Sequence, residues 1–253
     1  MMQQYTYMVI KNLNFLGHLT FKPGGLMTTF FMIFFPILIY LGMWQIDRGF
    51  EKQEVWKTYE ERKVMVPFEE LEFERKPLEE LWYRTIILKG KYKLKSYILD
   101  NRIYRNKKGY EIFTLFETVQ GKNILINRGW ADEDALSKIY EEKLSTNPVI
   151  IQGIISPFNR FGLNLKEEPK TESWPKKVQE LTFDQAFNDL KKYGLNNSIV
   201  QLSAASNMAL EPIWKPYQFK SSRHFGYALQ WFGLSLVLII SFIYFGVKKK
   251  YEN

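Results

Sequence analysis

Two uninterrupted apolar stretches, one near each end, dominate the hydropathy pattern of this 253-residue chain. The first runs from Leu26 to Ile46 and the second from Phe225 to Val247, and neither contains Lys, Arg, Asp or Glu. They hold 21 and 23 residues. Because a helix rises ~1.5 Å per residue, each stretch is long enough to cross a ~30 Å hydrocarbon core. The pattern therefore predicts two transmembrane helices, at 26–46 and 225–247.

The segment between these stretches, residues 47–224, has a different periodicity. Residues 47–63 are charged and helical in pattern, which predicts that the first helix continues into solvent until Pro67 ends it. From Trp82 onward apolar residues alternate with polar ones, as they do in half-buried strands. Short turns separate most of these strands, and such turns favour antiparallel pairing. About six strands are predicted, at 82–92, 96–104, 110–119, 124–130, 147–156 and 198–204.

Two short helices and one long loop interrupt this strand pattern. The helices are predicted at 132–143 and at 182–194, where Thr182 is the N-cap and Gly194 the stop signal. The loop is predicted at 157–178, which is rich in Pro and in charged residues. The predicted fold class is therefore an α+β membrane protein. Its two transmembrane helices flank either one antiparallel sheet or a small barrel closed from that sheet.

Composition narrows the classes of partner and chemistry. The 178 residues from 47 to 224 amount to one ordinary domain, with 30 basic and 26 acidic residues. This mixture is typical of a solvated surface, and without a basic stripe or a reading motif it argues against a nucleic-acid partner. The chain has no Cys, which excludes disulfides, thiolate catalysis, zinc–thiolate sites and iron–sulfur clusters.

The flanking charges predict an orientation in the membrane. Two spans place both termini on one side, and Lys or Arg in short flanks is retained in the cytoplasm. We therefore expect a cytoplasmic segment at 1–25, an external domain at 47–224 and a cytoplasmic basic tail at 248–253. The long first span has no small-residue cleavage site after it, unlike a signal peptide, and no Arg precedes Arg48, unlike a mitochondrial presequence. The simplest location is a bacterial plasma membrane.

Catalytic constellations are not apparent in this sequence. The two histidines, His18 and His224, lie at opposite ends of the chain and are expected on opposite sides of the membrane. A multi-His metal site within one chain is thus excluded, and a Ser-His-Asp triad would have only a poorly placed base. No Gly-rich phosphate-binding motif occurs. These observations predict that the protein is not an enzyme.

The outer ends of the two spans hold the best candidate site. Trp44 lies near the end of the first span, and His224, Tyr227 and Trp231 share one face of the second helix. One interpretation is structural, since aromatic side chains form interfacial belts and Gln side chains bond across packed helices. In the other, His224 is an axial ligand of haem iron, and the aromatic residues flank the apolar macrocycle.

Several short blocks, in this order along the chain, resemble those of the Surf1/Shy1 family of cytochrome c oxidase assembly proteins. The blocks are FKPG at 21–24, LGMWQIDRGFEK at 41–52, KGKY at 89–92, LDNR at 99–102, ILINRGW at 124–130, IIQGIISP at 150–157 and RHFGYALQWF at 223–232. The resemblance extends from Phe21 to about Val247. It implies a role in the maturation of haem–copper oxidase, around haem a insertion into the large catalytic subunit, and no enzymatic reaction.

The same resemblance implies a cofactor, partners and site residues. It places His224 at the position of a haem a ligand, with Trp44 and Trp231 as pocket walls. The partners it implies are oxidase subunit I, the haem a synthesis machinery and the lipid bilayer. Two other functions stay open: a protein-binding scaffold without haem, and an accessory or sensor protein with an external ligand-binding domain. Residues 128–130 are interpreted first as architecture, with Arg128 bonded to a carbonyl or to a haem propionate.

Overall fold

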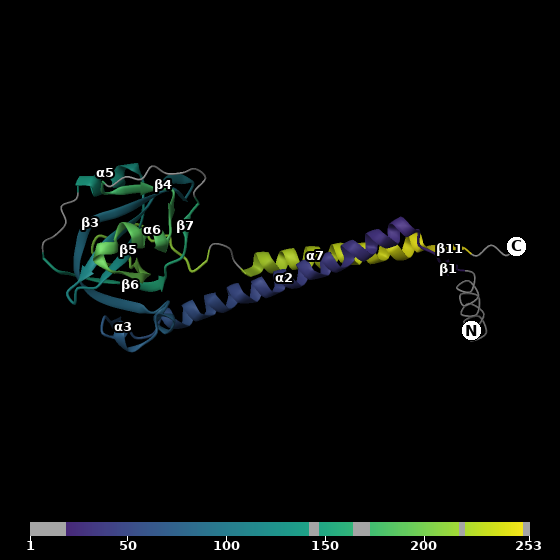
Figure 1. Ribbon diagram of the computed structural model, residues 1–253, viewed down its shortest axis with the longest axis horizontal. Coiled ribbons are helices and arrows are strands. Elements are labelled where there is room, and N and C mark those ends of the chain that lie inside the picture. The colour runs from purple at the N-terminus through teal and green to yellow at the C-terminus, as the bar shows by residue number, and fades with distance from the viewer. Residues whose placement is uncertain (1–18, 142–146, 164–172, 218–220, 250–253) are drawn as a thin grey trace, which may run out of the picture. The chain divides into compact units, whose positions relative to one another are not determined.

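The computed structural model describes residues 19–141, 147–163, 173–217 and 221–249 (Figure 1). The chain divides into two compact units. The helical unit combines the two ends of the chain, up to Glu54 and from Tyr217 onward. The β unit runs from Val55 to Pro216.

The helical unit contains both of the predicted apolar helices. Helix α2 spans Gly25–Lys63 and helix α7 spans Ser221–Gly246, and both are long and apolar enough to cross a membrane. Helix α2 continues past residue 46 and ends before Pro67, as predicted. Helix α7 ends one residue earlier than predicted, because Val247 belongs to strand β11 (Val247–Lys249), which pairs antiparallel with β1 (Leu19–Phe21). Residues 1–18, with His18, and residues 250–253 lie outside the described residues.

Glycines on α2 receive phenylalanine rings from α7. A Cβ atom at Gly42 would lie 2.6 Å from the ring of Phe232, and one at Gly49 would lie 2.6 Å from the ring of Phe225. The two contacts are seven residues apart on each helix and run in opposite directions along them, so the helices are antiparallel (Figure 1). Small residues permit this close approach. A seven-residue repeat keeps the same faces in contact over several turns.

The described residues of the β unit form a barrel of five strands. In sheet order these strands are β3 (Thr85–Tyr104), β4 (Lys107–Thr118), β5 (Asn123–Ala131), β10 (Leu195–Leu202) and β6 (Val149–Pro157). Strand β6 also pairs with β3, which closes the sheet on itself. Of the two predicted alternatives, the structure is therefore the small barrel. Its Greek-key order is one that OB-fold barrels also use.

The prediction of an antiparallel sheet is wrong in part, because the sheet is mixed. Strand β10 runs parallel to β5, and two short strands, β2 (Phe68–Glu69) and β8 (Lys176–Val178), run parallel to β3. The turn argument applies only to strands that follow each other directly. Strand β10 follows a long excursion, which lets it return beside β5 in the same direction. The strands predicted at 82–92 and 96–104 are one strand, β3, with an irregularity between Tyr92 and Ser96.

Short helices occur where the sequence predicts them. Helix α5 spans Glu133–Glu141, and residues 142–146 lie outside the described residues. Helix α6 spans Phe183–Asp189 and begins with the predicted cap, since the hydroxyl of Thr182 accepts a hydrogen bond from the Gln185 amide. A 3₁₀ turn follows (Lys191–Tyr193), and Gly194 at φ 61° ends it. Two further short helices, α3 (Glu72–Arg75) and α4 (Leu78–Leu81), lie between β2 and β3.

The stretch predicted as a loop at 157–178 contains two short strands. Strand β7 (Phe161–Gly162) pairs antiparallel with β9 (Glu180–Leu181), and β8 lies against β3. Residues 164–172 lie outside the described residues. The described apolar side chains of this stretch, Phe158, Phe161, Trp174 and Val178, belong to a packed layer over the barrel. Their burial against the barrel wall stabilises this layer.

Two layers of apolar side chains hold the β unit together. Alternate residues from all five strands fill the barrel, among them Ile86, Phe116, Ile126, Ile155 and Val200. The other alternate residues of β3, β4, β5 and β10 point outward and pack against α6 and the β7–β9 pair. This outer layer includes Tyr97, Leu99, Phe113, Leu125, Leu181, Ala186 and Ile199. Each of these strands buries one set of alternate residues inside the barrel and the other set under the outer layer. This burial on both faces explains why the strands are almost continuously apolar.

We predict that Gly42→Val separates α2 from α7, because two added methyl groups meet the ring of Phe232; overpacking of this kind costs about 1–3 kcal/mol. The natural chain has no Cys, so a reporter pair, Phe31→Cys with Phe242→Cys, can replace two rings that stack 4.2 Å apart. Oxidation should crosslink this pair within one chain, and Gly42→Val should slow the reaction about fivefold or more.

Gly233→Val is the matched control, because a Cβ atom at Gly233 meets nothing within 4 Å. It also lies in an apolar helix and adds the same volume. Crosslinking that is slowed equally by both valines would contradict the Gly42–Phe232 contact as the determinant of helix pairing.

Candidate functional site

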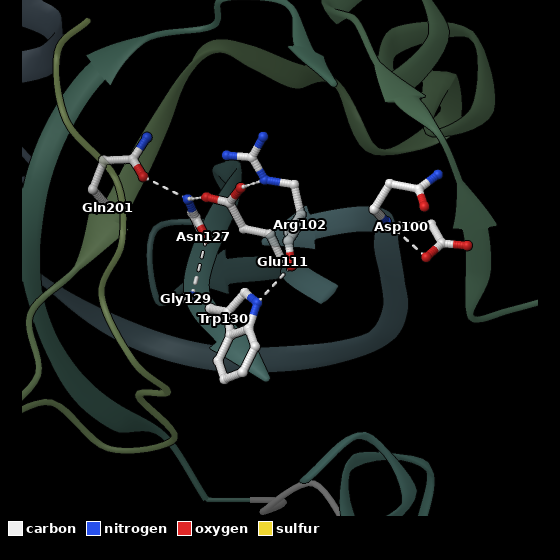
Figure 2. Close-up of polar contacts among 8 residues, drawn as sticks. Asp100, Arg102, Glu111, Asn127, Gly129, Trp130 and Gln201 are labelled. Atoms are coloured by element: carbon white, nitrogen blue, oxygen red, sulfur yellow. Dashed lines mark hydrogen bonds and ion pairs between the residues drawn. The ribbon is translucent and has the colours of Figure 1, made fainter. Parts of the chain in front are cut away.

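A continuous line of polar side chains crosses the wall of the barrel. Arg102 on β3 forms an ion pair with Glu111 on β4, with 2.7 Å between Nε and Oε2. Asn127 on β5 donates through Nδ2 to Glu111 Oε1 and to Gln201 Oε1 on β10, both at 2.7 Å (Figure 2). Gln201 Nε2 then donates to Ser156 Oγ on β6, at 2.9 Å. These five residues, called the polar belt below, follow the order of the strands in the sheet.

Four of the five belt residues are buried and Arg102 is partly exposed, so most of the belt must find its hydrogen bonds within the protein. Glu111, Asn127 and Ser156 expose 1%, 3% and 0% of their surface. A buried carboxylate is costly unless it is paired, and Arg102 supplies the opposite charge to Glu111. Asn127 uses its oxygen as well, since Oδ1 accepts from the Gly129 amide at 3.0 Å. Both the nitrogen and the oxygen of the Asn127 side-chain amide therefore have hydrogen-bond partners (Figure 2).

The residues after Asn127 fix the backbone around the belt. Gly129 has a φ of 111°, and a Cβ atom there would lie 2.5 Å from the carbonyl oxygen of Glu211. Only glycine adopts this conformation without strain and permits this approach. Trp130 Nε1 donates to the Arg102 carbonyl at 2.9 Å (Figure 2). Gly129 and Trp130 therefore anchor β5 to β3 and to the segment that follows β10.

Arg128 agrees with the architectural interpretation of this motif. It is buried, at 3% exposure, and its Nε donates to the Met208 carbonyl at 2.8 Å. Its guanidinium lies 6.0 Å from the ring centre of Tyr92, a residue of the barrel core. Of the two partners expected for Arg128, the structure supplies the carbonyl.

A cavity of about 280 Å³ opens beside the polar belt, within the β unit. Asn127 and Gln201 of the belt line it, together with the aromatic rings of Tyr59 and Trp214. The ring centres of Tyr59 and Trp214 lie 6.0 Å apart, edge to face, and Tyr83 lies 6.5 Å from Trp214. Burial raises the pKa of the Tyr83 phenol above its ordinary value.

In the helical unit, the structure brings His224 and Gln45 together. Nδ1 of His224, in the first turn of α7, lies 2.8 Å from Oε1 of Gln45 on α2, and the contact is partly buried. In this orientation of Gln45 its oxygen faces the ring and can only accept, so the contact fits the His224 tautomer with the proton on Nδ1. Nε2 then keeps its lone pair, which is the form of imidazole that ligates metal ions.

The three aromatic residues of the predicted site lie on the same two helices. Trp44 and Tyr227 expose 43% and 53% of their surface, and Trp231 is intermediate. Exposed aromatic side chains on apolar helices suit both interpretations, an interfacial belt and the walls of a pocket. The assignment of Trp44, Tyr227 and Trp231 to a cofactor pocket stays a prediction.

Comparison with known proteins assigns the chain to a family. The model of the SURF1 family matches residues 32–236. The chain belongs to the SURF1 family. A SURF1-like protein of Rickettsia conorii is 26% identical over 230 residues, which cover 86% of this chain and 90% of that protein. A SURF1-like protein of Rickettsia prowazekii is 27% identical over 221 residues, which cover 83% and 85%. SURF1 proteins are known generally as cytochrome oxidase assembly factors.

The SURF1 match covers both candidate sites, the His224–Gln45 contact and the polar belt with its cavity. The sequence interpretation singles out His224 of the first candidate site and misses most of the second. It contains Asn127 only as part of the ILINRGW block and gives no role to Glu111 or Gln201. The available signal was a polar residue inside an apolar strand, as in YEIFTLF and SIVQL. A buried strand keeps such a residue only where it has a partner.

We predict that Asn127→Leu destabilises the β unit of this SURF1 protein by about 3 kcal/mol or more. The substitution leaves Glu111 Oε1, Gln201 Oε1 and the Gly129 amide without their partner, and each buried unsatisfied group costs about 1–3 kcal/mol. Urea unfolding of the full chain, followed by the far-UV circular dichroism of the sheet, measures the loss.

Asn188→Leu on α6 is the matched control, because Asn188 is exposed. It should change stability by about 0.5 kcal/mol or less. If the two substitutions had equal effects, the belt would contribute nothing beyond an ordinary surface amide.

Proposed function

We propose that this SURF1 protein assists the assembly of haem–copper cytochrome c oxidase by holding haem a for insertion into subunit I. Three observations support the proposal: the family, the two apolar helices and the geometry of His224. The observation that carries it is the 2.8 Å contact between His224 Nδ1 and Gln45 Oε1. No catalytic step is part of this function, which is one of binding and transfer.

The residues around His224 fit a haem cargo. Metal-ligating histidines donate their other ring N–H to a fixed acceptor, and this partner sets both tautomer and ring orientation. Gln45 is such an acceptor, and it lies on a different helix from the histidine. In the proposed complex His224 Nε2 ligates the iron, and Trp44, Tyr227 and Trp231 contact the apolar macrocycle. The haem iron supplies the open coordination position that the imidazole fills.

We further propose that α2 and α7 cross a bacterial plasma membrane over 26–46 and 225–247, with both termini cytoplasmic and residues 47–224 external. Pairing between β1 and β11 supports a common side for both termini, because it joins the start of α2 to the end of α7. The Lys22 amide also donates to the Gly246 carbonyl at 2.7 Å. The exposed apolar side chains of both helices, such as Met32, Ile37, Leu236 and Ile240, would contact lipid.

Haem binding can be tested on the full chain, purified from cells that make haem a. We expect a Soret band in the natural protein and its loss or strong weakening in His224→Ala. Gln45→Leu should weaken haem affinity about tenfold or more, since the imidazole loses its orienting partner. His18→Ala is the matched control and should leave the spectrum unchanged.

Two results would change the assignment. A spectrum unaffected by His224→Ala would remove His224 as the ligand. If the pure protein lacks haem but co-purifies with oxidase subunit I, the scaffold function without haem is the correct one. A protein with neither property would be consistent with an accessory or sensor role, and neighbouring kinase or permease genes, in place of oxidase genes, would support that alternative.

A further inference from the structure

The cavity of the β unit is electrically neutral. Its lining, within the part of the chain that the structure describes, contains no Asp, Glu, Lys, Arg or His. The nearest charges of the belt, Arg102 and Glu111, neutralise each other in an ion pair. An ionised ligand would lose its hydration in this cavity and gain no opposite charge, so the lining disfavours carboxylates, phosphates and ammonium groups. The cavity therefore differs in chemistry from any site for an iron or for haem propionates.

The polar belt presents a fixed hydrogen-bonding edge to the cavity. Gln201 lines the cavity, and its side-chain amide is held in place by Asn127 on one side and by Ser156 on the other. An amide nitrogen carries two N–H groups, and Ser156 takes one of them. The second N–H would be the donor for a carbonyl oxygen of a ligand. Because the belt is buried and bonded, this donor is preorganised and costs little entropy on binding.

Aromatic rings form another wall of the same cavity. Tyr59 comes from the last turns of α2 and Trp214 from the segment after β10. Their planes are 68° apart, so the two rings present a face and an edge rather than two parallel faces. A flat ring can stack on one of them and meet the edge of the other. An aliphatic ligand would bury its apolar surface in the cavity but would make no ring–ring contact with Tyr59 or Trp214.

The size of the cavity limits the ligand to one or two rings. A volume of about 280 Å³ corresponds to about nine water molecules at ~30 Å³ each. It falls just below the usual range for drug-sized ligands. From these observations we propose that the cavity binds a small, neutral, planar ring compound with a carbonyl or amide edge, which Gln201 recognises and which packs on Tyr59 and Trp214.

Three probes of nearly equal size separate the elements of this proposal. Benzamide is neutral and planar and has an amide edge, benzoate is its anion-bearing equivalent at pH 7, and cyclohexanecarboxamide keeps the amide without the flat ring. Binding to the full chain in detergent is measured by saturation-transfer NMR and titration calorimetry. We expect benzamide to bind with a Kd of about 1 mM or below, in the range of a fragment. Benzoate and cyclohexanecarboxamide should bind at least tenfold more weakly.

Variants locate the binding. Gln201→Leu removes the N–H donor, and Trp214→Ala, outside the polar belt, removes the stacking ring; each should weaken benzamide binding about tenfold. Ala204→Phe fills the cavity from its rim and should abolish binding without touching the belt. Gln185→Leu on α6, away from the cavity, is the matched control for Gln201→Leu and should leave the affinity unchanged. Circular dichroism of each variant verifies folding.

The outcomes decide the proposal independently of haem. Benzamide that fails to bind, that binds no better than benzoate, or that binds equally to Ala204→Phe would overturn it. His224→Ala should leave benzamide affinity unchanged, because His224 belongs to the helical unit and the cavity to the β unit. A protein that binds benzamide but no haem would keep this inference and overturn the proposed function. A protein that binds haem but no benzamide would overturn this inference and keep the proposed function.

Discussion

The side-chain amide of Asn127 is the contact on which the β unit depends. It bonds to Glu111 on one neighbouring strand, to Gln201 on the other and to the backbone of Gly129. Backbone ladders alone would permit β5 and β10 to slide in steps of two residues, since such a slip keeps the apolar faces inside. The belt permits one register only, because any slip separates a buried donor from its acceptor. The hydrogen bonds of the belt therefore fix the strand register, and the register sets the shape of the barrel and of the cavity beside it.

In the helical unit, contact between glycine and phenylalanine has the corresponding role. Gln45 lies between Gly42 and Gly49, at helical spacings of three and four residues, so it shares their face and points to α7. The bond from His224 to Gln45 is thus a consequence of the register that the glycines impose. A histidine held in this way has a defined tautomer before any ligand arrives. The same residues would serve a purely structural pairing of the helices, and the haem spectrum of the His224 variant separates the two interpretations.

The parts of the fold that depend on local sequence could be predicted. Hydropathy located both apolar helices, capping chemistry located α6, and alternation located most strands. The parallel pairing of β5 with β10 could not be predicted, because it follows from where the chain returns after a long excursion and not from any short pattern. Of the candidate sites, the His224 face was visible in the periodicity of α7. The cavity was not, since Tyr59, Gln201 and Trp214 come from separate parts of the sequence and meet only in the folded β unit.

The two candidate sites differ in whether a substitution would first affect function or first affect folding. In the function proposed above, His224 offers a lone pair, so its loss would remove a chemical function while the Gly42 and Gly49 contacts still pair the helices. The belt residues are bonded to each other, so the loss of any one of them first affects folding, and function only as a consequence. Tyr59 and Trp214 lie between these extremes, because they line the cavity but take no part in the belt. Substitutions of these two rings are therefore the ones that can separate a function of the β unit from its stability.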